Sequence, residues 1–193
     1  MKIILGSSSK YRKAVLESNG YEFEIMSPDI DEKAIRTHDY YQLPLLIARA
    51  KADALIPKVS EDALVITSDQ VVVCNNDLHE KPKDQEEAKV FLEKYSNGHP
   101  AETVSALVVT NTKNGKRVEG IDIAKVYYNP IPAMTVEEFI KNGDPFSKAG
   151  GFAIQSAILQ PYQNRIEGTE DCVMGMPLEL LEKLIKEVQY DFC

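Results

Sequence analysis

Short apolar runs and helical stripes alternate along the chain. Residues 3–5 and 63–73 are apolar enough for buried strands, and 21–27 alternate between apolar and polar residues like a half-buried strand. Residues 43–55 carry apolar side chains at helical spacing, and a second helix of this kind is expected directly after Asp84. Strands that alternate with helices are typical of an α/β fold.

A hairpin and two further helices are predicted in the second half of the chain. The alternating runs 102–110 and 117–128 flank the turn sequence TKNGK and predict two antiparallel strands. Thr135 is expected to cap a short helix, and Pro177 is expected to begin the last one. The apolar face of this last helix consists of Leu181, Leu184, Ile185 and Val188. A hairpin beside helix-linked strands predicts a mixed sheet.

The segment 6–13, GSSSKYRK, places hydroxyl and cationic side chains between the strand 3–5 and the helix that follows it. Ser9 is expected to cap that helix and Gly20 to close it. A helix start leaves backbone N–H groups unpaired, and the helix dipole adds positive charge, so such a place attracts anions. We interpret the segment as a phosphate cradle, and the alternative is an ordinary N-cap with solvated basic residues. Its candidate residues are Ser7, Ser9, Arg12 and Lys13.

The composition fits one large domain or two small lobes, since 193 residues that are 44% hydrophobic can build a core. Cys74, Cys172 and Cys193 have neither metal-ligand spacing nor an evident pairing, so we expect a reducing compartment. No charged and apolar leader precedes Ile3, and no apolar run approaches the roughly 20 residues of a spanning helix. We therefore expect a cytoplasmic protein that has no membrane partner.

The net charge of −8 limits the kinds of molecule that the protein is expected to bind. Broad binding to nucleic-acid backbones needs a basic face, so we expect no nucleic-acid partner. Screening over about 8 Å at physiological ionic strength lets a local cluster of Lys and Arg outweigh a distant acidic surface. A phosphorylated small molecule, helped by a divalent cation, therefore stays compatible with the charge.

Asp69 lies inside the apolar run 63–73, which is interrupted by four polar residues at 67–70. An unpaired carboxylate in apolar surroundings is unfavourable or shifts its pKa, so Asp69 needs a partner, a metal or a water-filled cleft. Perturbed buried acids are often functional, which makes Asp69 a candidate for chemistry. The alternatives are a strand end or a structural hydrogen bond to a loop N–H.

Three further positions break the local pattern. Lys51 lies on the stripe of 43–55 that should face the core, although its stem could snorkel outward. Lys81 lies in the segment HEKPKD at 79–84, for which a solvated loop is the alternative. Gln155 interrupts an apolar stretch after two glycines, which suggest close backbone approach or a tight bend.

Together these positions supply an anion cradle, a carboxylate, several cations and an amide, which is a set that suits phosphate chemistry. His38, His79 and His99 lie beside no motif of a nucleophilic triad, and no zinc ligand set is evident.

Five motifs, in order from Ile3 to the C-terminal helix, resemble those of the Maf family of nucleoside triphosphate pyrophosphatases. LGSSSKYRK is similar to the family's LASxSPRR, ITSDQVV to GADTVV, and EKP to LxKP. SKAGGFAIQ is similar to KAGGYGIQ, and VMGMPL to VVGLPL.

The resemblance implies a mixed-sheet α/β fold of the Maf and ITPase-like type, as one domain over 1–193 with two lobes around a cleft, and a homodimer. It implies an enzyme that cleaves between the α and β phosphates with Mg²⁺ or Mn²⁺ and releases a nucleoside monophosphate and pyrophosphate. The catalytic residues would be Asp69 as proton acceptor, Lys51 and Lys81. The substrate-binding residues would be Ser7, Ser9, Tyr11, Arg12, Lys13, Gln70, Lys148 and Gln155. Asp69 is also expected to be a metal ligand, and Asp31 and Glu32 in the segment SPDIDEK are candidates for additional ligands on their residue type, independently of the resemblance.

Departures from the family pattern bear on the base that is recognised. Members acting on 7-methyl-GTP carry an aromatic residue and Gln where this chain has Tyr11 and Gln70. An aromatic face also favours a methylated, cationic guanine by stacking and by cation–π attraction. Gln155 instead resembles the members that act on dTTP and UTP. Two indicators against one favour 7-methyl-GTP.

Two other classes of function are compatible with the sequence. A nucleotide-binding regulator without catalysis is compatible with the lost proline and arginine of the SPRR motif, because a fold and a pocket do not guarantee chemistry. A structural role in septum formation is attached to the family by name, although these residues supply no polymer-binding surface.

Overall fold

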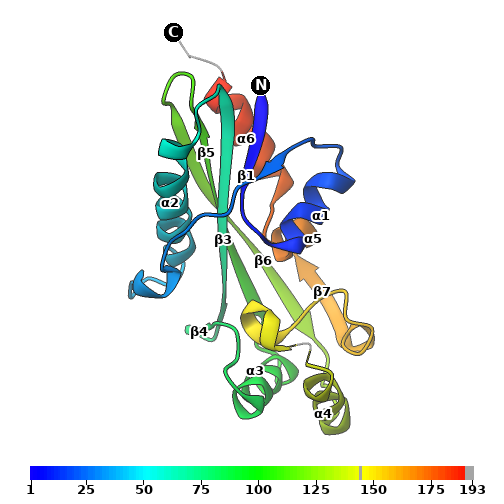
Figure 1. Cartoon of the computed structure of the whole chain (residues 1–193). Helices are drawn as coiled ribbons and strands as arrows, with labels where there is room; N and C mark the ends of the chain where they lie inside the picture. Colours follow the sequence, from blue (N-terminus) through cyan, green and yellow to red (C-terminus); the bar gives the residue numbers. More distant parts are fainter. Residues whose placement is uncertain (144, 190–193) are drawn as a thin grey trace. The chain divides into compact units, whose positions relative to one another are not determined.

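The computed structural model describes residues 1–143 and 145–189, which form a mixed α/β architecture (Figure 1). The strands are β1 (Lys2–Gly6), β2 (Glu24–Ile25), β3 (Ala63–Cys74), β4 (Asp77–His79), β5 (Ala101–Asn111), β6 (Arg117–Tyr128) and β7 (Gln163–Glu167). The helices are α1 (Lys10–Ser18), α2 (Leu43–Leu55), α3 (Gln85–Ser96), α4 (Ala133–Lys141), α5 (Glu170–Val173) and α6 (Leu178–Gln189). Short 3-10 turns are η1 (Glu32–Ala34), η2 (Ile56–Lys58), η3 (Pro145–Ser147), η4 (Ala149–Gly151) and η5 (Gln160–Tyr162).

The strands of the described residues form one seven-stranded sheet in the order β2-β1-β3-β5-β6-β7, with β4 paired to β3. β1 runs parallel to both β2 and β3, with Leu5 opposite Ile25 on one side and Ile66 on the other. β4 is antiparallel to β3, and β7 is antiparallel to β6. The predicted α/β fold with a mixed sheet is confirmed.

The chain divides into two compact units. The first unit comprises residues 1–70, 105–122 and the segment from 174 onward, and the second comprises 71–104 and 123–173. Strands β3, β5 and β6 contribute residues to both units. The expectation of a single domain over 1–193 stays a prediction.

Alternate residues of β5 pack on opposite faces of the sheet in the first unit. Leu107 and Val109 join the core that α1 and α6 cover, whereas Ala106 and Val108 pack against α2. Figure 1 shows α2 on one side of these strands, with α1 and α6 on the other. Successive strand side chains point to opposite faces, so this alternation is expected of a sheet covered by helices on both faces. A core-facing side chain of α2 therefore points toward the sheet.

Helix α1 begins where the sequence predicts. Ser9 is its N-cap in an extended conformation, and the Ser9 hydroxyl accepts the backbone N–H of Arg12 at 3.5 Å. The helix ends at Ser18, and Gly20 follows with φ +76°, a conformation that favours glycine.

Two element predictions are wrong in extent. The strand expected over 21–27 is reduced to β2, because only Glu24 and Ile25 pair with β1, whereas Tyr21 and Phe23 pack on the core as loop residues. Helix α4 begins at Ala133 after Pro132, so Thr135 lies inside the helix and does not cap it. The alternation over 21–27 and the Thr135 hydroxyl are present in the sequence, but tertiary packing determines which residues form the strand and where the helix begins.

The cysteines have no evident chemistry. Cys74 and Cys172 are buried free thiols, and burial raises the pKa of Cys74 to about 11, which keeps the thiol protonated. Cys193 lies outside the described residues. Within 1–143 and 145–189, no helix is long and apolar enough to cross a membrane.

Buried aromatic rings contact one another in the second unit. His79 stacks on Phe91 with ring centroids 3.8 Å apart, and Tyr95 contacts the rings of Tyr128 and Phe152. A solvated loop was the alternative for the HEKPKD segment. It is wrong at His79, which ends β4 and is buried, whereas Lys81 is exposed and lies outside the helices and strands.

Replacing Gly150 with Ala is expected to lower the free energy of unfolding by about 2–4 kcal/mol. An added Cβ would lie 2.8–2.9 Å from three atoms of the Val72 side chain, and φ is +72°. Gly98→Ala is the matched control in the same unit, since its φ is +88° but no described atom lies within 4 Å of its Cβ position. The free energy of unfolding of the control should fall by only about 1 kcal/mol, because its substitution adds backbone strain without crowding. Urea unfolding measures both, and equal losses would contradict the crowding argument.

Candidate active site

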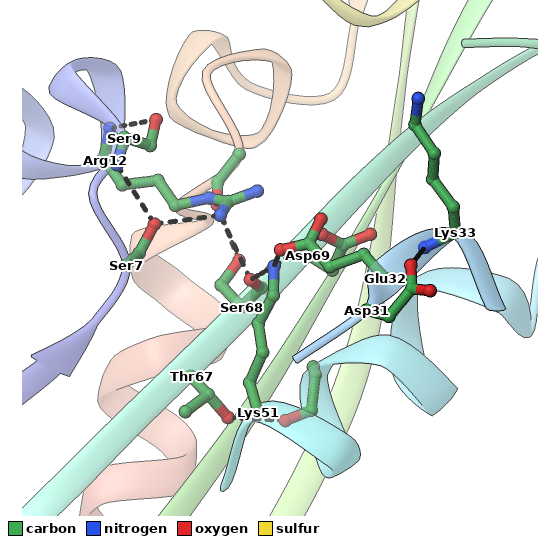
Figure 2. Close-up of polar contacts among 12 residues, drawn as sticks. Ser7, Ser9, Arg12, Asp31, Glu32, Lys33, Lys51, Thr67, Ser68 and Asp69 are labelled. Atoms are coloured by element: carbon green, nitrogen blue, oxygen red, sulfur yellow. Dashed lines mark hydrogen bonds and ion pairs between the residues drawn. The ribbon is translucent and has the colours of Figure 1, made fainter. Parts of the chain in front are cut away.

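Lys51 and Asp69 form a buried ion pair in the first unit. The Lys51 ammonium lies 2.8 Å from Asp69 Oδ1 and 3.0 Å from Glu32 Oε1, and it also donates to the Ser68 carbonyl at 3.2 Å. Figure 2 shows the two carboxylates converging on this ammonium. Lys51 is only 4% exposed, so the alternative in which it snorkels into solvent is wrong.

Local geometry explains why Lys51 points at β3. α2 covers one face of the sheet, and Lys51 lies on its core face between Ile47 and Leu55, both of which are buried. The Thr67 hydroxyl donates to the Ala48 carbonyl at 2.7 Å, which fixes β3 against this turn of α2. The polar segment 67–70 is thereby held beside the lysine.

The surroundings of Asp69 change its proton affinity. Burial raises its pKa above the usual range, and the positive charges of Lys51 and Arg12 oppose this shift. Asp69 thus has an ion-pair partner, and the alternative of a strand end is wrong because β3 continues to Cys74. A carboxylate with a raised pKa can accept a proton at neutral pH more readily than an ordinary one.

Arg12 joins three segments of the first unit. Its Nε donates to the Gly175 carbonyl at 3.1 Å, and its Nη1 donates to Ser7 Oγ at 3.1 Å and to the Ser68 carbonyl at 3.0 Å. Burial lowers the pKa of the guanidinium, which nevertheless stays charged because arginine titrates far above neutral pH. The arrangement places a fixed cation close to Asp69.

Ser7 and Ser9 lie at the N-terminus of α1, where an anion could bind. Ser7 Oγ accepts the Ser9 N–H at 3.2 Å and also accepts Arg12 Nη1. Because these two bonds use both lone pairs of the hydroxyl, the remaining capacity of Ser7 is to donate. A phosphate oxygen is an acceptor of the required kind.

The other residues of the cradle lie at its edge. Lys13 pairs with Glu17 one turn along α1 at 3.5 Å, and the ammonium of Lys10 lies 5.2 Å from the centre of the Tyr11 ring. Contact of Lys13 or Tyr11 with a substrate stays a prediction.

Gln70 is held beside Gly175. Its Nε2 donates to Ser105 Oγ at 3.0 Å. A Cβ at Gly175 would lie 3.2 Å from Arg12 Nε and 3.5 Å from the Gln70 carboxamide carbon, and φ there is +85°. Gly175 therefore admits both side chains close to its backbone.

The metal ligands predicted from the sequence are only partly brought together. Asp31 caps η1 by accepting the Lys33 N–H at 3.1 Å, whereas Glu32 and Asp69 both contact Lys51. In the part of the chain that the structure describes, no group of three or more His, Cys, Asp or Glu residues could hold a metal ion. Mg²⁺ at nucleotide sites is usually bound by one or two carboxylates and by substrate phosphates. Asp69 and Glu32 supply two carboxylates that lie close enough together to contact one cation, which in this structure is the Lys51 ammonium.

Lys81, Lys148 and Gln155 belong to the second unit. Lys81 and Gln155 are exposed, and Lys148 precedes η4. Gln155 lines a polar pocket of about 430 Å³ together with the side chains of Ile154, Gln160, Gln163, Asn164 and Glu170. Contact of these three residues with a substrate stays a prediction.

Comparisons with known proteins agree with the sequence motifs. A family model described as Maf-like protein matches residues 2–188. A 7-methyl-GTP pyrophosphatase of Dictyostelium discoideum is 42% identical, with 96% of each chain covered. A dTTP/UTP pyrophosphatase of Vibrio parahaemolyticus is 32% identical, with 97% of each chain covered. A solved dITP/XTP pyrophosphatase of Mycobacterium abscessus is 14% identical, with 98% of this chain and 96% of that chain covered and a TM-score of 0.46.

Proposed function

Since the chain belongs to the Maf family, we propose that it is a nucleoside triphosphate pyrophosphatase. It hydrolyses the bond between the α and β phosphates and releases a nucleoside monophosphate and pyrophosphate. The observation that carries the proposal is the buried Asp69, which is paired with Lys51 and feels the charge of Arg12, whose guanidinium donates to the hydroxyl of Ser7.

In the proposed reaction Asp69 orients a water and accepts its proton. Oδ1 of Asp69 holds Lys51, and a carboxylate has a second oxygen that can accept from water. Lys51 and Arg12 stabilise the negative charge that develops on the phosphates, and Ser7 donates to a phosphate oxygen. Lys81 and Lys148 supply further positive charge, and Ser9 and Lys13 complete the cradle.

A divalent cation, Mg²⁺ or Mn²⁺, belongs to the proposal. Asp69 and Glu32 would hold it with the substrate phosphates, and Asp31 would be a further ligand next to Glu32. Such an ion neutralises phosphate charge and lowers the pKa of a bound water.

7-Methyl-GTP is the favoured substrate. Tyr11 offers an aromatic face for a methylated guanine, Gln70 is fixed beside Gly175, and the Dictyostelium relative is named for this activity. dTTP and UTP are the alternative, which Gln155 and the Vibrio relative support. A non-catalytic regulator fits less well, because the chain keeps the Asp69 and Lys51 pair. We also propose that the protein is a cytoplasmic homodimer.

Pyrophosphate release by the purified protein with Mg²⁺ tests the proposal across 7-methyl-GTP, UTP, dTTP, CTP, GTP and ITP. We expect the largest kcat/KM for 7-methyl-GTP. A preference for UTP or dTTP would favour the alternative substrate, and binding without release from any nucleotide would favour the regulator.

A further inference from the structure

Gly150 joins two segments of the second unit through its backbone. Its N–H donates to the Glu80 carbonyl at 3.1 Å, and its carbonyl accepts the Tyr95 hydroxyl at 2.9 Å. A Cβ on the next residue would lie 3.2 Å from a ring carbon of Pro82, so the segments 80–82 and 148–155 are also in close contact there. These segments carry Lys81, Lys148 and Gln155.

The Tyr95 hydroxyl is itself oriented by a buried histidine. Because this hydroxyl donates its one hydrogen to Gly150, the His79 Nδ1, which lies 2.9 Å away, must donate to the Tyr95 oxygen. His79 Nε2 is then the acceptor, and it lies 3.5 Å from the Lys94 ammonium, which also pairs with Asp77 at 2.6 Å. The donor and the acceptor are thereby assigned in the bonds that link Gly150, Tyr95 and His79.

Both aromatic residues are rigidly packed. Tyr95 is 0% exposed and His79 is 1% exposed, and the histidine ring is stacked in parallel on Phe91. Burial, reinforced by the charge of Lys94, lowers the pKa of His79 to about 4. His79 is therefore neutral at neutral pH, with one ring nitrogen protonated.

We propose that Tyr95 and His79 are positioning residues, which hold the segments of Lys81, Lys148 and Gln155 in the arrangement that binds the triphosphate. Neither side chain touches the substrate in this scheme. Both act through the backbone of Gly150, where Tyr95 bonds the carbonyl and the Glu80 segment bonds the N–H. The inference rests on the proposed function, because it assigns a binding role to the cations and the amide of these segments.

The second unit offers a matched pair of tyrosines for the test. Tyr128 packs against Tyr95 and is also buried, but its hydroxyl has no hydrogen-bond partner among the described residues. Tyr95→Phe and Tyr128→Phe therefore each remove one buried hydroxyl from the same aromatic cluster. Only the first removes a bond to the Gly150 segment.

Two measurements are made on both variants. In hydrogen–deuterium exchange without nucleotide, Tyr95→Phe should speed exchange in peptides that cover 78–83 and 146–156, and Tyr128→Phe should not. In steady-state kinetics with the preferred nucleotide, well below the unfolding temperature, Tyr95→Phe should raise KM about tenfold with a smaller change in kcat. Tyr128→Phe should stay within about twofold of the wild type.

Substitutions of His79 give an independent readout. The amide of His79→Asn can still donate to the Tyr95 oxygen, whereas His79→Leu cannot. His79→Leu should therefore raise KM, and the KM of His79→Asn should lie closer to the wild-type value. Unchanged KM in Tyr95→Phe, with only a lower unfolding temperature, would overturn the proposal, as would equal effects of the two tyrosine variants. If the wild type cleaves no nucleotide, the proposed function fails, and the exchange experiment alone decides whether Tyr95 and His79 hold these segments.

Discussion

Replacing Asp69 with Asn is expected to lower kcat for pyrophosphate release by about 10²–10⁴-fold, which is the range attributed to a general base. Asn has nearly the same shape and can still contact Lys51, but it cannot accept a proton from water. Binding of the nucleotide should persist, because Arg12 and Ser7 keep their mutual contacts. Turnover under single-turnover conditions and binding by calorimetry separate the two effects.

Asp53→Asn is the matched control for Asp69→Asn. Asp53 also lies in the first unit and pairs with a cation, Arg117 at 2.7 Å, but its side chain is 66% exposed. This control should keep full turnover. If Asp69→Asn also kept its turnover, the proposed role of Asp69 would be wrong, and a loss of binding with an unchanged kcat would make Asp69 a binding residue.

The stability of Asp69→Asn should depend on pH in a defined direction. Because burial raises the pKa of Asp69 in the folded state, the folded protein binds this proton more tightly than the unfolded chain does. The wild type therefore loses this contribution to stability as the pH rises from the ordinary Asp range through the raised value. Asn has no such proton, so the variant should gain stability relative to the wild type over the same range.

Local patterns were sufficient to predict helices α1 and α2 of the first unit. α2 extends over Leu43–Leu55 as its apolar spacing predicts, and Ser9 caps α1. The prediction failed over 21–27, where the alternation of apolar and polar residues is real. There the apolar side chains of Tyr21 and Phe23 pack as loop residues, because few backbone groups of that segment reach a neighbouring strand.

The candidate site was predictable as a set of residue types but not as a set of contacts. Lys51 and Asp69 each broke an apolar pattern, yet they are 18 residues apart, and only the packing of α2 on β3 brings them together. Glu32 was expected to be a metal ligand and contacts Lys51. The carbonyls of Ser68 and Gly175, which accept Arg12, have no signal in residue chemistry, because every residue type has such a group.

The second large effect is expected for Lys51→Met, which removes the cation between Asp69 and Glu32. Loss of one partner of a buried ion pair destabilises proteins by about 3–5 kcal/mol, because the other charge is left buried. The loss should be largest at alkaline pH and smaller in acid, where protonation of Asp69 removes the unpaired charge. Arg49→Met is the control, since Arg49 lies on the same helix and forms an exposed pair with Glu119 that should contribute at most about 1 kcal/mol.

The pH–rate profile of Lys51→Met distinguishes a catalytic effect from a loss of folded protein. The charge of Lys51 lowers the pKa of Asp69, so its removal leaves burial less opposed and raises that pKa further. If Asp69 must be ionised to accept a proton, the acid limb of kcat/KM should move to higher pH in the variant, and kcat/KM on the plateau should fall about 10²-fold or more because a phosphate-stabilising charge is lost. A merely unfolded fraction would lower the whole profile without moving the limb. A limb at the wild-type position would therefore contradict the prediction, because either Lys51 does not tune Asp69 or another group sets the acid limb.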